Sequence, residues 1–398
     1  MKFVLPRYIN GNRGDIASRW GLLRALHDLG EHDGTVFCVH PEDAPQELYP
    51  SLPCGKYHNL LLTRDGRTAL AQADTVLWGV GLDMQDDSSL ARLLYLRVIF
   101  GLYRQMGKRI WCLFQGAGPL TTRLGSMLVR QVLDQVNCFV ARDPGSLGLL
   151  QRLSTNAHIH LGYDAIFLPG FEADLQPLTV TPGWYKALWN TSQPVVGLNL
   201  RQWFHFSSSL LPYEFSKKKY LARSLPKMEQ LLDTFTSCIQ QLRQRFQARL
   251  LLISAYQPGV VPWEDDLTWL ERLKARFAGD PQVVLVNETI PMPLYFQLMS
   301  HLDLMIGMRL HSSLIALRFG VPAINLSYTL KGKDIYDYLG LSDNVVALPE
   351  VLAEPDCIIN MAGRILSDAA AEREKTRRVV AQAVEKNSQL LCEILKTH

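Results

Sequence analysis

Hydrophobic residues along the chain fall alternately into short continuous runs and into longer stretches with a helical period. Short apolar runs bounded by glycine or proline are typical of buried strands, whereas apolar residues at intervals of three and four indicate amphipathic helices. In the first half of the chain, strands are predicted at 2–5, 36–40, 60–62, 73–79, 109–114 and 138–141. Helices are predicted at 15–29, 89–106, 122–136 and 145–153. This alternation favours a parallel sheet covered by helices.

The alternation stops between Pro169 and Pro194, where four prolines stand among mixed polar residues, and then resumes. Further strands are predicted at 195–200, 249–254, 283–287, 303–306 and 323–327. Further helices are predicted at 228–246, 264–277, 293–301 and 310–319, with a long loop at 202–227. The pattern therefore predicts an α/β protein with two Rossmann-like domains, at 1–180 and 194–365, and a C-terminal helix at 366–398.

Length and composition agree with two domains of a soluble globular protein. The chain has 398 residues, of which 47% are hydrophobic and 20% are charged. The longest apolar run, 93–103, is interrupted by Arg97 and is shorter than the roughly 20 residues of a membrane span. The N-terminal segment lacks the apolar core of a signal peptide, so we expect a cytoplasmic protein.

Charge and cysteine content narrow the classes of partner. A net charge of +3 is too small to favour nucleic acid, although it suits an anionic small substrate. The seven cysteines are scattered and contain no C-x-x-C pair. They therefore indicate neither a disulfide framework nor a zinc site, and we expect no metal.

The most informative stretch runs from Asp303 to Lys331, where a strand, a helix and a second strand follow one another. Arg309 and His311 lie at the turn from the strand to the helix. Free backbone N–H groups and the helix dipole already favour an anion at such a turn. The sequence adds a permanent cation and a titratable imidazole, although each could also serve only to pair with a neighbouring side chain.

Other polar residues also follow predicted strands, and ligands of open parallel sheets bind beyond the carboxyl ends of the strands. The set comprises Arg7, Asn10, Asn12, Asp15, Gln115, Arg142, Asp143, Asp164, Arg201, Arg309, His311 and Lys331. Arg201, Arg309 and Lys331 come from three strand ends of the second half. Because arginine binds carboxylate and phosphate in bidentate geometry, these three predict a site for a compact anionic ligand.

Several members of this set have an equally ordinary structural interpretation. Asn12 and Asp15 precede a predicted helix and could simply cap it. Arg142 and Asp143 are interpreted as a salt bridge and a helix cap. Asp164 is compatible both with the ligand site and with a structural turn.

The ordered set of motifs resembles the polysaccharide pyruvyl transferase family. Within 303–331 the resemblance rests on a D-x-x-I-G-x-R-L-H-S turn, a G-V-P strand start and Tyr328-x-x-Lys331. The remaining motifs, in chain order, are Asn12-Arg13-Gly14-Asp15, Gln115 to Pro119, Ala141-Arg142-Asp143 with Ser146, Gly162-Tyr163-Asp164 and Gly197 to Arg201. The chain departs from the family where Gly79-Val80-Gly81 replaces consecutive glycines.

The resemblance implies a glycosyltransferase B-like fold, in which two Rossmann-like domains with parallel sheets face a cleft. It also implies transfer of pyruvate from phosphoenolpyruvate to two hydroxyls of a saccharide, forming a ketal and releasing phosphate. Such a reaction belongs to cell-surface polysaccharide biosynthesis. Phosphoenolpyruvate is then the donor substrate, no cofactor is expected, and the saccharide acceptor is free or lipid-linked.

The same resemblance implies roles for residues of the second half. His311 and Arg309 are expected to be catalytic, since histidine can gain or lose a proton near pH 7. Arg201, Arg309, Leu310 and Lys331 are expected to bind phosphoenolpyruvate. The arginines would also stabilise the charge that develops on the leaving phosphate.

The acceptor is expected on the opposite side of the cleft, in contact with Asn12, Asp15 and Gln115. The segment 203–219 combines aromatic and basic residues. We interpret it either as a contact for sugar rings or for an anionic, lipid-linked acceptor at a membrane surface, or as a lid with an ordinary basic run.

Two other functions remain compatible with the sequence. The first is a nucleotide-sugar-dependent glycosyltransferase of the same fold, which would need an acidic residue near the ribose. Near that position the first charged residue is Lys331, and the acidic Asp334 follows only afterwards, which disfavours this function. The second is a non-catalytic saccharide-binding homologue, which the presence of Arg201, Arg309 and His311 disfavours.

Overall fold

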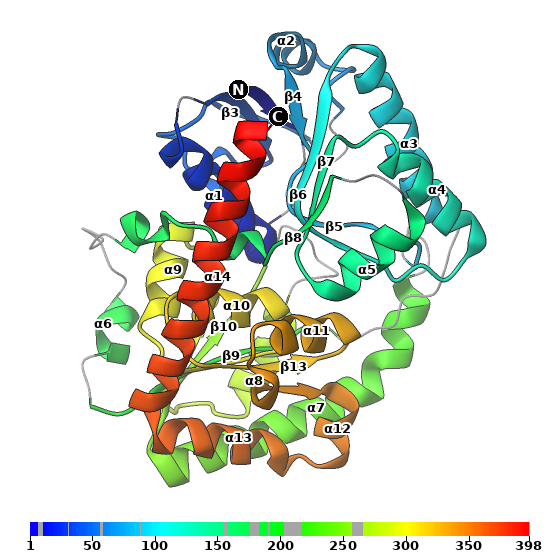
Figure 1. Cartoon of the computed structure of the whole chain (residues 1–398). Coiled ribbons are helices and arrows are strands. Elements are labelled where there is room, and N and C mark those ends of the chain that lie inside the picture. The colour runs from blue at the N-terminus through cyan, green and yellow to red at the C-terminus, as the bar shows by residue number, and fades with distance from the viewer. Residues whose placement is uncertain are drawn as a thin grey trace.

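The computed structural model shows two parallel sheets, each flanked by helices (Figure 1). It describes residues 1–6, 11–30, 32–55, 59–87, 89–154, 158–175, 183–189, 192–202, 217–256 and 266–397. Paired strands run parallel in both sheets. The predicted fold class is confirmed.

The first sheet has the order β3-β2-β1-β4-β6-β7-β8, with β5 paired to β6. Its strands are β1 (Lys2–Leu5), β2 (Asp33–Cys38), β3 (Ser51–Pro53), β4 (Thr75–Leu77), β5 (Gly81–Met84), β6 (Arg109–Ala117), β7 (Cys138–Ala141) and β8 (Ile159–Leu161). Its helices are α1 (Arg13–Asp28), α2 (Arg64–Gln72), α3 (Leu90–Gln105), α4 (Arg123–Leu133) and α5 (Pro144–Leu153). Short 3₁₀ turns η1 (Pro41–Asp43), η2 (Ala165–Phe167) and η3 (Phe171–Leu175) and helix α6 (Gly183–Trp189) complete this part.

The second sheet has the order β11-β10-β9-β12-β13-β14. Its strands are β9 (Val195–Asn199), β10 (Arg249–Ile253), β11 (Val283–Val286), β12 (Leu304–Gly307), β13 (Ala323–Ser327) and β14 (Val345–Ala347). Its helices are α7 (Lys217–Phe246), α8 (Leu267–Ala275), α9 (Met292–Ser300), α10 (Leu310–Arg318), α11 (Leu330–Tyr338), α12 (Leu348–Ala353) and α13 (Asp356–Ser367). The central strands β9, β12 and β13 are buried along their whole length, as expected for a parallel sheet covered on both faces.

Two local predictions were wrong. Residues 60–62 form a turn, because the Asn59 side chain and carbonyl accept the N–H groups of Leu61 and Leu62 at 2.9 and 3.0 Å. The predicted loop at 202–227 is helical from Lys217, where α7 begins. Residues 203–216, which hold most of the predicted aromatic and basic segment, lie outside the described residues.

One hydrophobic core joins the two domains. Side chains of α1, η2 and η3 from the first domain share it with side chains of α9 and α10 from the second. Within it, the rings of Trp20 and Phe296 meet edge to face with centroids 5.9 Å apart. The domains are therefore packed against each other directly and not only through a linker.

The last helix, α14 (Ala369–Thr397), crosses from the second domain to the first (Figure 1). Val380 lies in the shared core, whereas Leu391 and Ile394 lie in a core of the first domain. Between them, the buried Asn387 accepts the Tyr163 N–H at 2.8 Å and donates to the backbone carbonyls of Asp164 and Phe167, at the two ends of η2. The helix thus ties both domains to the segment that carries Asp164.

Among the described residues, no helix is long and apolar enough to cross a bilayer.

Candidate active site

A cavity of about 660 Å³ lies between the two domains. Its walls are the turns that follow β1, β5, β6 and β7 of the first sheet and β9, β10, β12 and β13 of the second. The carboxyl ends of both sheets thus face one space, as the rule for ligand sites in open parallel sheets requires. Most of the predicted site residues line it, namely Asn12, Asp15, Arg201, Arg309, Leu310, His311 and Lys331.

Arg309 is the N-cap residue of α10 and is held by a buried carboxylate. Its Nη2 donates to Asp266 Oδ1 at 2.7 Å, and its guanidinium lies 4.4 Å above the Tyr256 ring. Asp266 is fully buried and also accepts the Asn199 side chain at 3.2 Å. Arg309 therefore has a fixed orientation toward the cavity.

Arg201 approaches the same cavity from the end of β9. Its guanidinium lies 4.5 Å above the Tyr328 ring and donates to the Tyr328 hydroxyl. Ser327 at the end of β13 and the following Tyr328 and Thr329 also line the cavity. The second domain therefore places two arginines, one from β9 and one from β12, around one space.

Backbone N–H groups add to this positive character. The helices α10 and α11 have Arg309 and Thr329 at their N-caps, and neither receives a side-chain cap hydrogen bond. Across the cavity, Asn12 and Asp143 do cap α1 and α5, by accepting first-turn N–H groups at 3.1 and 2.7 Å. Donors at the start of α10 and α11 are thus available for a ligand anion on the second-domain side.

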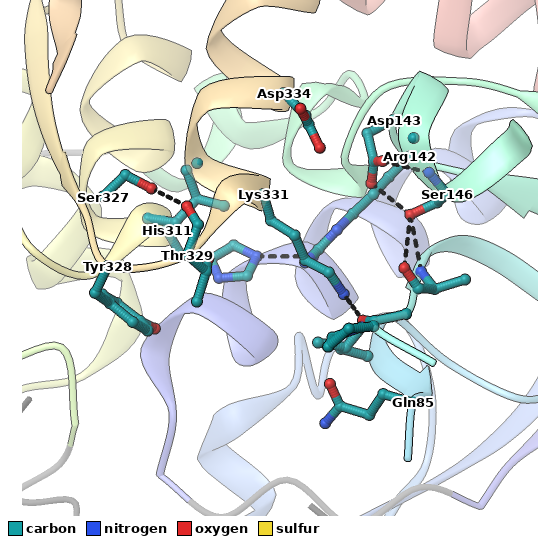
Figure 2. Close-up of a pocket in the computed structure, with 18 of the residues that line it drawn as sticks. Gln85, Arg142, Asp143, Ser146, His311, Ser327, Tyr328, Thr329, Lys331 and Asp334 are labelled. Carbon is teal, nitrogen blue, oxygen red and sulfur yellow. Dashed lines mark hydrogen bonds between the residues drawn. The ribbon is translucent and has the colours of Figure 1, made fainter. Parts of the chain in front are cut away.

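His311 reaches across the interface to a carboxylate of the first domain. Its Nε2 lies 3.3 Å from Asp164 Oδ2. The same atom lies 3.4 Å from Arg142 Nη1 (Figure 2). Asp164 Oδ1 accepts the Ser18 hydroxyl at 2.7 Å. Burial alone would raise the pKa of Asp164, but His311, Arg142 and Ser18 hold it well below its usual range. An ionised carboxylate therefore orients the imidazole and offers a counter-charge to its protonated form.

These contacts place Asp164, which the sequence left open, and extend the interpretation of Arg142. Asp164 belongs to the interdomain site, because it contacts His311 directly. Arg142 does form a salt bridge, at 2.8 Å, but with Asp164 instead of the neighbouring Asp143. Asp143 caps α5, as predicted. Arg142 also lines the cavity, so it is a site cation that the sequence interpretation had assigned to structure alone.

Lys331 spans the cavity from α11 toward the first domain. Its ammonium donates to the carbonyl of Gly118, and it lies beside Arg142 in the centre of the site (Figure 2). Burial, with a smaller contribution from the charge of Arg142, lowers the pKa of Lys331 to about 7. The Lys331 side chain therefore loses its charge within the physiological pH range. The sequence predicted Lys331 as a binding residue but did not predict this change of charge.

Gln115 does not line the cavity, in contrast to its predicted contact with the acceptor. Its side chain is fully buried and donates to the carbonyls of Trp78, at 2.6 Å, and of Gly79. The predicted strand ended before Gln115, whereas β6 continues to Ala117. Gln115 is thus an internal strand residue that braces β4 against β6, and its predicted role is corrected.

Asn12 and Asp15 lie on the first-domain side of the cavity. Asn12 caps α1 and donates to Asp15 Oδ2 at 3.1 Å. The capping interpretation is therefore confirmed for Asn12. Because both residues also line the cavity, contact with an acceptor stays a prediction.

The sequence model of the polysaccharide pyruvyl transferase family matches residues 12–329. No curated protein matches the chain. Among solved structures, the UDP-GlcNAc 2-epimerase from Neisseria meningitidis bound to UDP-GlcNAc is similar, with a TM-score of 0.58 and 13% identity over 100% of both chains.

Two further structures share the fold. The Anabaena protein Alr3699/HepE in complex with UDP-glucose has a TM-score of 0.58 and 12% identity over 100% of both chains. The trehalose-6-phosphate synthase OtsA has a TM-score of 0.60 and 12% identity, covering 100% of this chain and 99% of the other. At these identities the similarity is one of fold, and the fold is the glycosyltransferase B type.

Proposed function

The chain belongs to the polysaccharide pyruvyl transferase family, and on this premise we propose that it transfers pyruvate from phosphoenolpyruvate to two hydroxyls of a saccharide. The product is a cyclic ketal, and phosphate is released. We place the reaction in the cytoplasm and in the biosynthesis of a cell-surface polysaccharide.

The observation that carries the proposal is the uneven distribution of charge around the cavity, because carboxylates on the first-domain side, such as Asp143, offset its cations Arg142 and Arg152. Arg201, Arg309 and two helix N-termini without side-chain caps all lie on the second-domain side. Phosphoenolpyruvate carries a carboxylate and a phosphate on a three-carbon frame, so it needs two groups of donors at close range. The two arginines, which come from neighbouring strands, supply them.

The chemistry requires proton transfer at several atoms. A proton added to C3 of the enol makes C2 electrophilic, and the first sugar hydroxyl forms a bond to C2. The bond between C2 and the phosphate oxygen then breaks, and the second hydroxyl closes the ring. Of the two hydroxyl protons, one balances the proton taken up by C3 and the other leaves with phosphate.

His311 is the proposed proton donor, because it is a titratable side chain at the cavity and is oriented by Asp164. Arg309 and Arg201 hold the donor and stabilise the charge of the departing phosphate. Lys331 lies between the domains. While its ammonium is protonated, it neutralises the charge of the same phosphate. Asn12 and Asp15 offer hydrogen-bonding groups to acceptor hydroxyls on the other side.

The test is to incubate the purified protein with phosphoenolpyruvate and a panel of sugars, and to follow phosphate release together with the acceptor mass. We expect phosphate release with a matching gain of one pyruvate ketal. Phosphate release without that gain would indicate hydrolysis and contradict the proposal. Consumption of a nucleotide sugar would instead indicate a glycosyltransferase, and saccharide binding without turnover would indicate a non-catalytic homologue.

The pKa of Lys331 predicts how donor binding depends on pH. Below pH 7 the side chain is charged, and its charge is lost as the pH rises through about 7. The phosphate of the donor favours the charged form of Lys331, so the affinity for phosphoenolpyruvate should fall as Lys331 loses its charge. Between about pH 6 and about pH 8, this fall should be about tenfold larger in the wild type than in Lys331→Gln. The affinity is measured by equilibrium binding of phosphoenolpyruvate at both pH values. Protonation of the donor's own phosphate affects both proteins equally, so it cancels in the comparison.

The neighbouring Lys333→Gln is the matched control, since Lys333 is exposed and pairs with Asp337 on the same helix. It should keep the wild-type pH dependence. An equal pH dependence in wild type and Lys331→Gln would show that Lys331 does not contact the donor.

Gly14 provides a test of the interdomain geometry. A Cβ atom at this position would lie 2.3 Å from the Cβ atom of His311, so Gly14→Ala must displace the imidazole or part the domains. A displacement of about 1 Å at a catalytic group is enough to lower turnover about a hundredfold. Turnover and melting temperature should be compared with Gly148→Ala on α5, where a Cβ would meet only the end of Arg152 at 3.9 Å. Unchanged turnover in Gly14→Ala would contradict the assigned position of His311.

A further inference from the structure

The first domain carries a patch of exposed apolar side chains on α3, its C-cap and α4. Of ten large hydrophobic side chains that are exposed among the described residues, seven lie there. They are Leu94, Tyr95, Val98, Leu102, Met106, Leu124 and Met127. We call this surface the α3–α4 face; its helices lie on the flank opposite α14 (Figure 1).

These exposed side chains do not belong to the face of α3 that packs into the hydrophobic core. The other side of α3, with Leu93, Leu96, Ile99 and Phe100, is fully buried against the first sheet. A helix that is apolar on its buried face needs no apolar residues on its outer face for folding. Seven exposed apolar side chains gathered on two neighbouring helices therefore mark an interaction surface.

The charges on the α3–α4 face indicate which kind of partner it binds. Neither helix contains an acidic residue, and among the described residues next to their ends the exposed acid is Asp134 at the C-cap of α4. Five exposed arginines lie on the two helices, namely Arg92, which pairs with the buried Asp83, and Arg97, Arg104, Arg123 and Arg130. A bilayer with anionic lipids matches this mixture, because acyl chains accept the apolar side chains and headgroup phosphates accept the arginines. A second copy of the chain fits less well, since symmetric pairing would bring like charges together.

The α3–α4 face is continuous with the rim of the cavity. Gln85 and Leu120, which precede α3 and α4, both line the cavity. The buried carboxylate of Asp86 accepts the backbone N–H groups of Thr121 and Thr122, each at 2.7 Å, and so ties the start of α4 to the segment before α3. Both helices therefore begin at the acceptor side of the cavity and run outward from it.

We propose that the α3–α4 face docks the protein on an anionic lipid bilayer and thereby brings the first-domain side of the cavity to a saccharide carried by a membrane lipid. The nature of the acceptor rests on the proposed function, whereas the docking itself does not. This surface differs from the aromatic and basic segment at 203–219, for which membrane contact was one of the interpretations that the sequence left open.

The experiment is sedimentation of the full-length protein with vesicles of phosphatidylcholine containing phosphatidylglycerol, compared with vesicles of phosphatidylcholine alone. The wild type should bind the anionic vesicles at least about tenfold more tightly, and high salt should weaken that binding. The combined variant Leu94→Glu, Val98→Glu and Met127→Glu should lose at least about tenfold in binding. Leu62→Glu is the control, because Leu62 is 75% exposed and lies outside the face.

Circular dichroism and the melting temperature of each variant would show that the fold is retained, since all three replaced side chains are exposed. Equal binding of both kinds of vesicle, no binding by the wild type, or undiminished binding by the triple variant would overturn the proposal. So would a wild-type dimer that the triple variant converts to monomer in sedimentation velocity. Pyruvylation of a water-soluble acceptor should be unchanged in the triple variant. A protein that binds vesicles without any pyruvyl transfer would leave the docking intact and refute the proposed function instead.

Discussion

Replacing His311 by alanine should reduce turnover about a thousandfold and leave the fold intact. Proton transfer by a positioned side chain contributes about a hundredfold to ten-thousandfold, and His311 is the imidazole at the cavity. Its ring is partly exposed and oriented by Asp164, so its removal takes no side chain out of the hydrophobic core. The measurement is the rate of phosphate release at saturating phosphoenolpyruvate and acceptor.

His27→Ala is the matched control, since His27 lies on α1 with its side chain 53% exposed and away from the cavity. It should keep the wild-type rate. Circular dichroism and the melting temperature would show that both variants are folded. A near-normal rate for His311→Ala would refute the acid–base assignment and shift attention to Lys331.

The change Arg309→Lys should lower kcat/KM for phosphoenolpyruvate by about a hundredfold or more, although it preserves the charge. The guanidinium contacts Asp266 through both Nε and Nη2 and stacks on Tyr256. A lysine ammonium is a point donor, so it cannot satisfy the buried carboxylate and face the donor at the same time. We also expect a loss of about 1 to 3 kcal/mol in the free energy of unfolding, because one carboxylate oxygen loses its partner.

Arg318→Lys separates the two effects. Arg318 belongs to the same helix, α10, but its side chain pairs with Glu172 and the Leu168 carbonyl, away from the cavity. This variant should lose stability yet keep kcat/KM within about twofold. If Arg309→Lys behaved in the same way, Arg309 would only support Asp266, and the donor would have to be bound through Arg201.

The fold was predictable from the sequence where elements are long or wholly apolar. The runs at β1, β6, β9 and β13 are read directly as buried strands, and the charged C-terminal helix is found within a few residues of its observed start. The strands β3, β5, β8 and β14 were missed because they have only three or four residues. In addition, β3, β5 and β8 include a proline or a polar residue, so they lack the continuous apolar run that identifies a buried strand. The helical start of α7 was missed because Pro226 stands within the helix and suggests a break.

The candidate site was predictable only in part. Arg201, Arg309, His311 and Lys331 converge because they follow strands whose carboxyl ends must meet, which the sequence order reveals. Asp266 could not be found in this way, since it follows no predicted strand and its contact with Arg309 depends on tertiary packing. Asp164, the partner of His311, was among the candidates, but its contact with His311 depends on how the two domains pack.

The core shared by α1, η2, α9 and α10 has a consequence for the catalytic cycle. Opening the cavity by a hinge motion would expose this apolar surface to water, at about 25 cal/mol for each Å². Such a cost on every turnover would be large compared with the gain from binding a small donor. The entropy of ordering the cavity is therefore lost once, when the chain folds, and substrates exchange through the mouth of a pre-organised site.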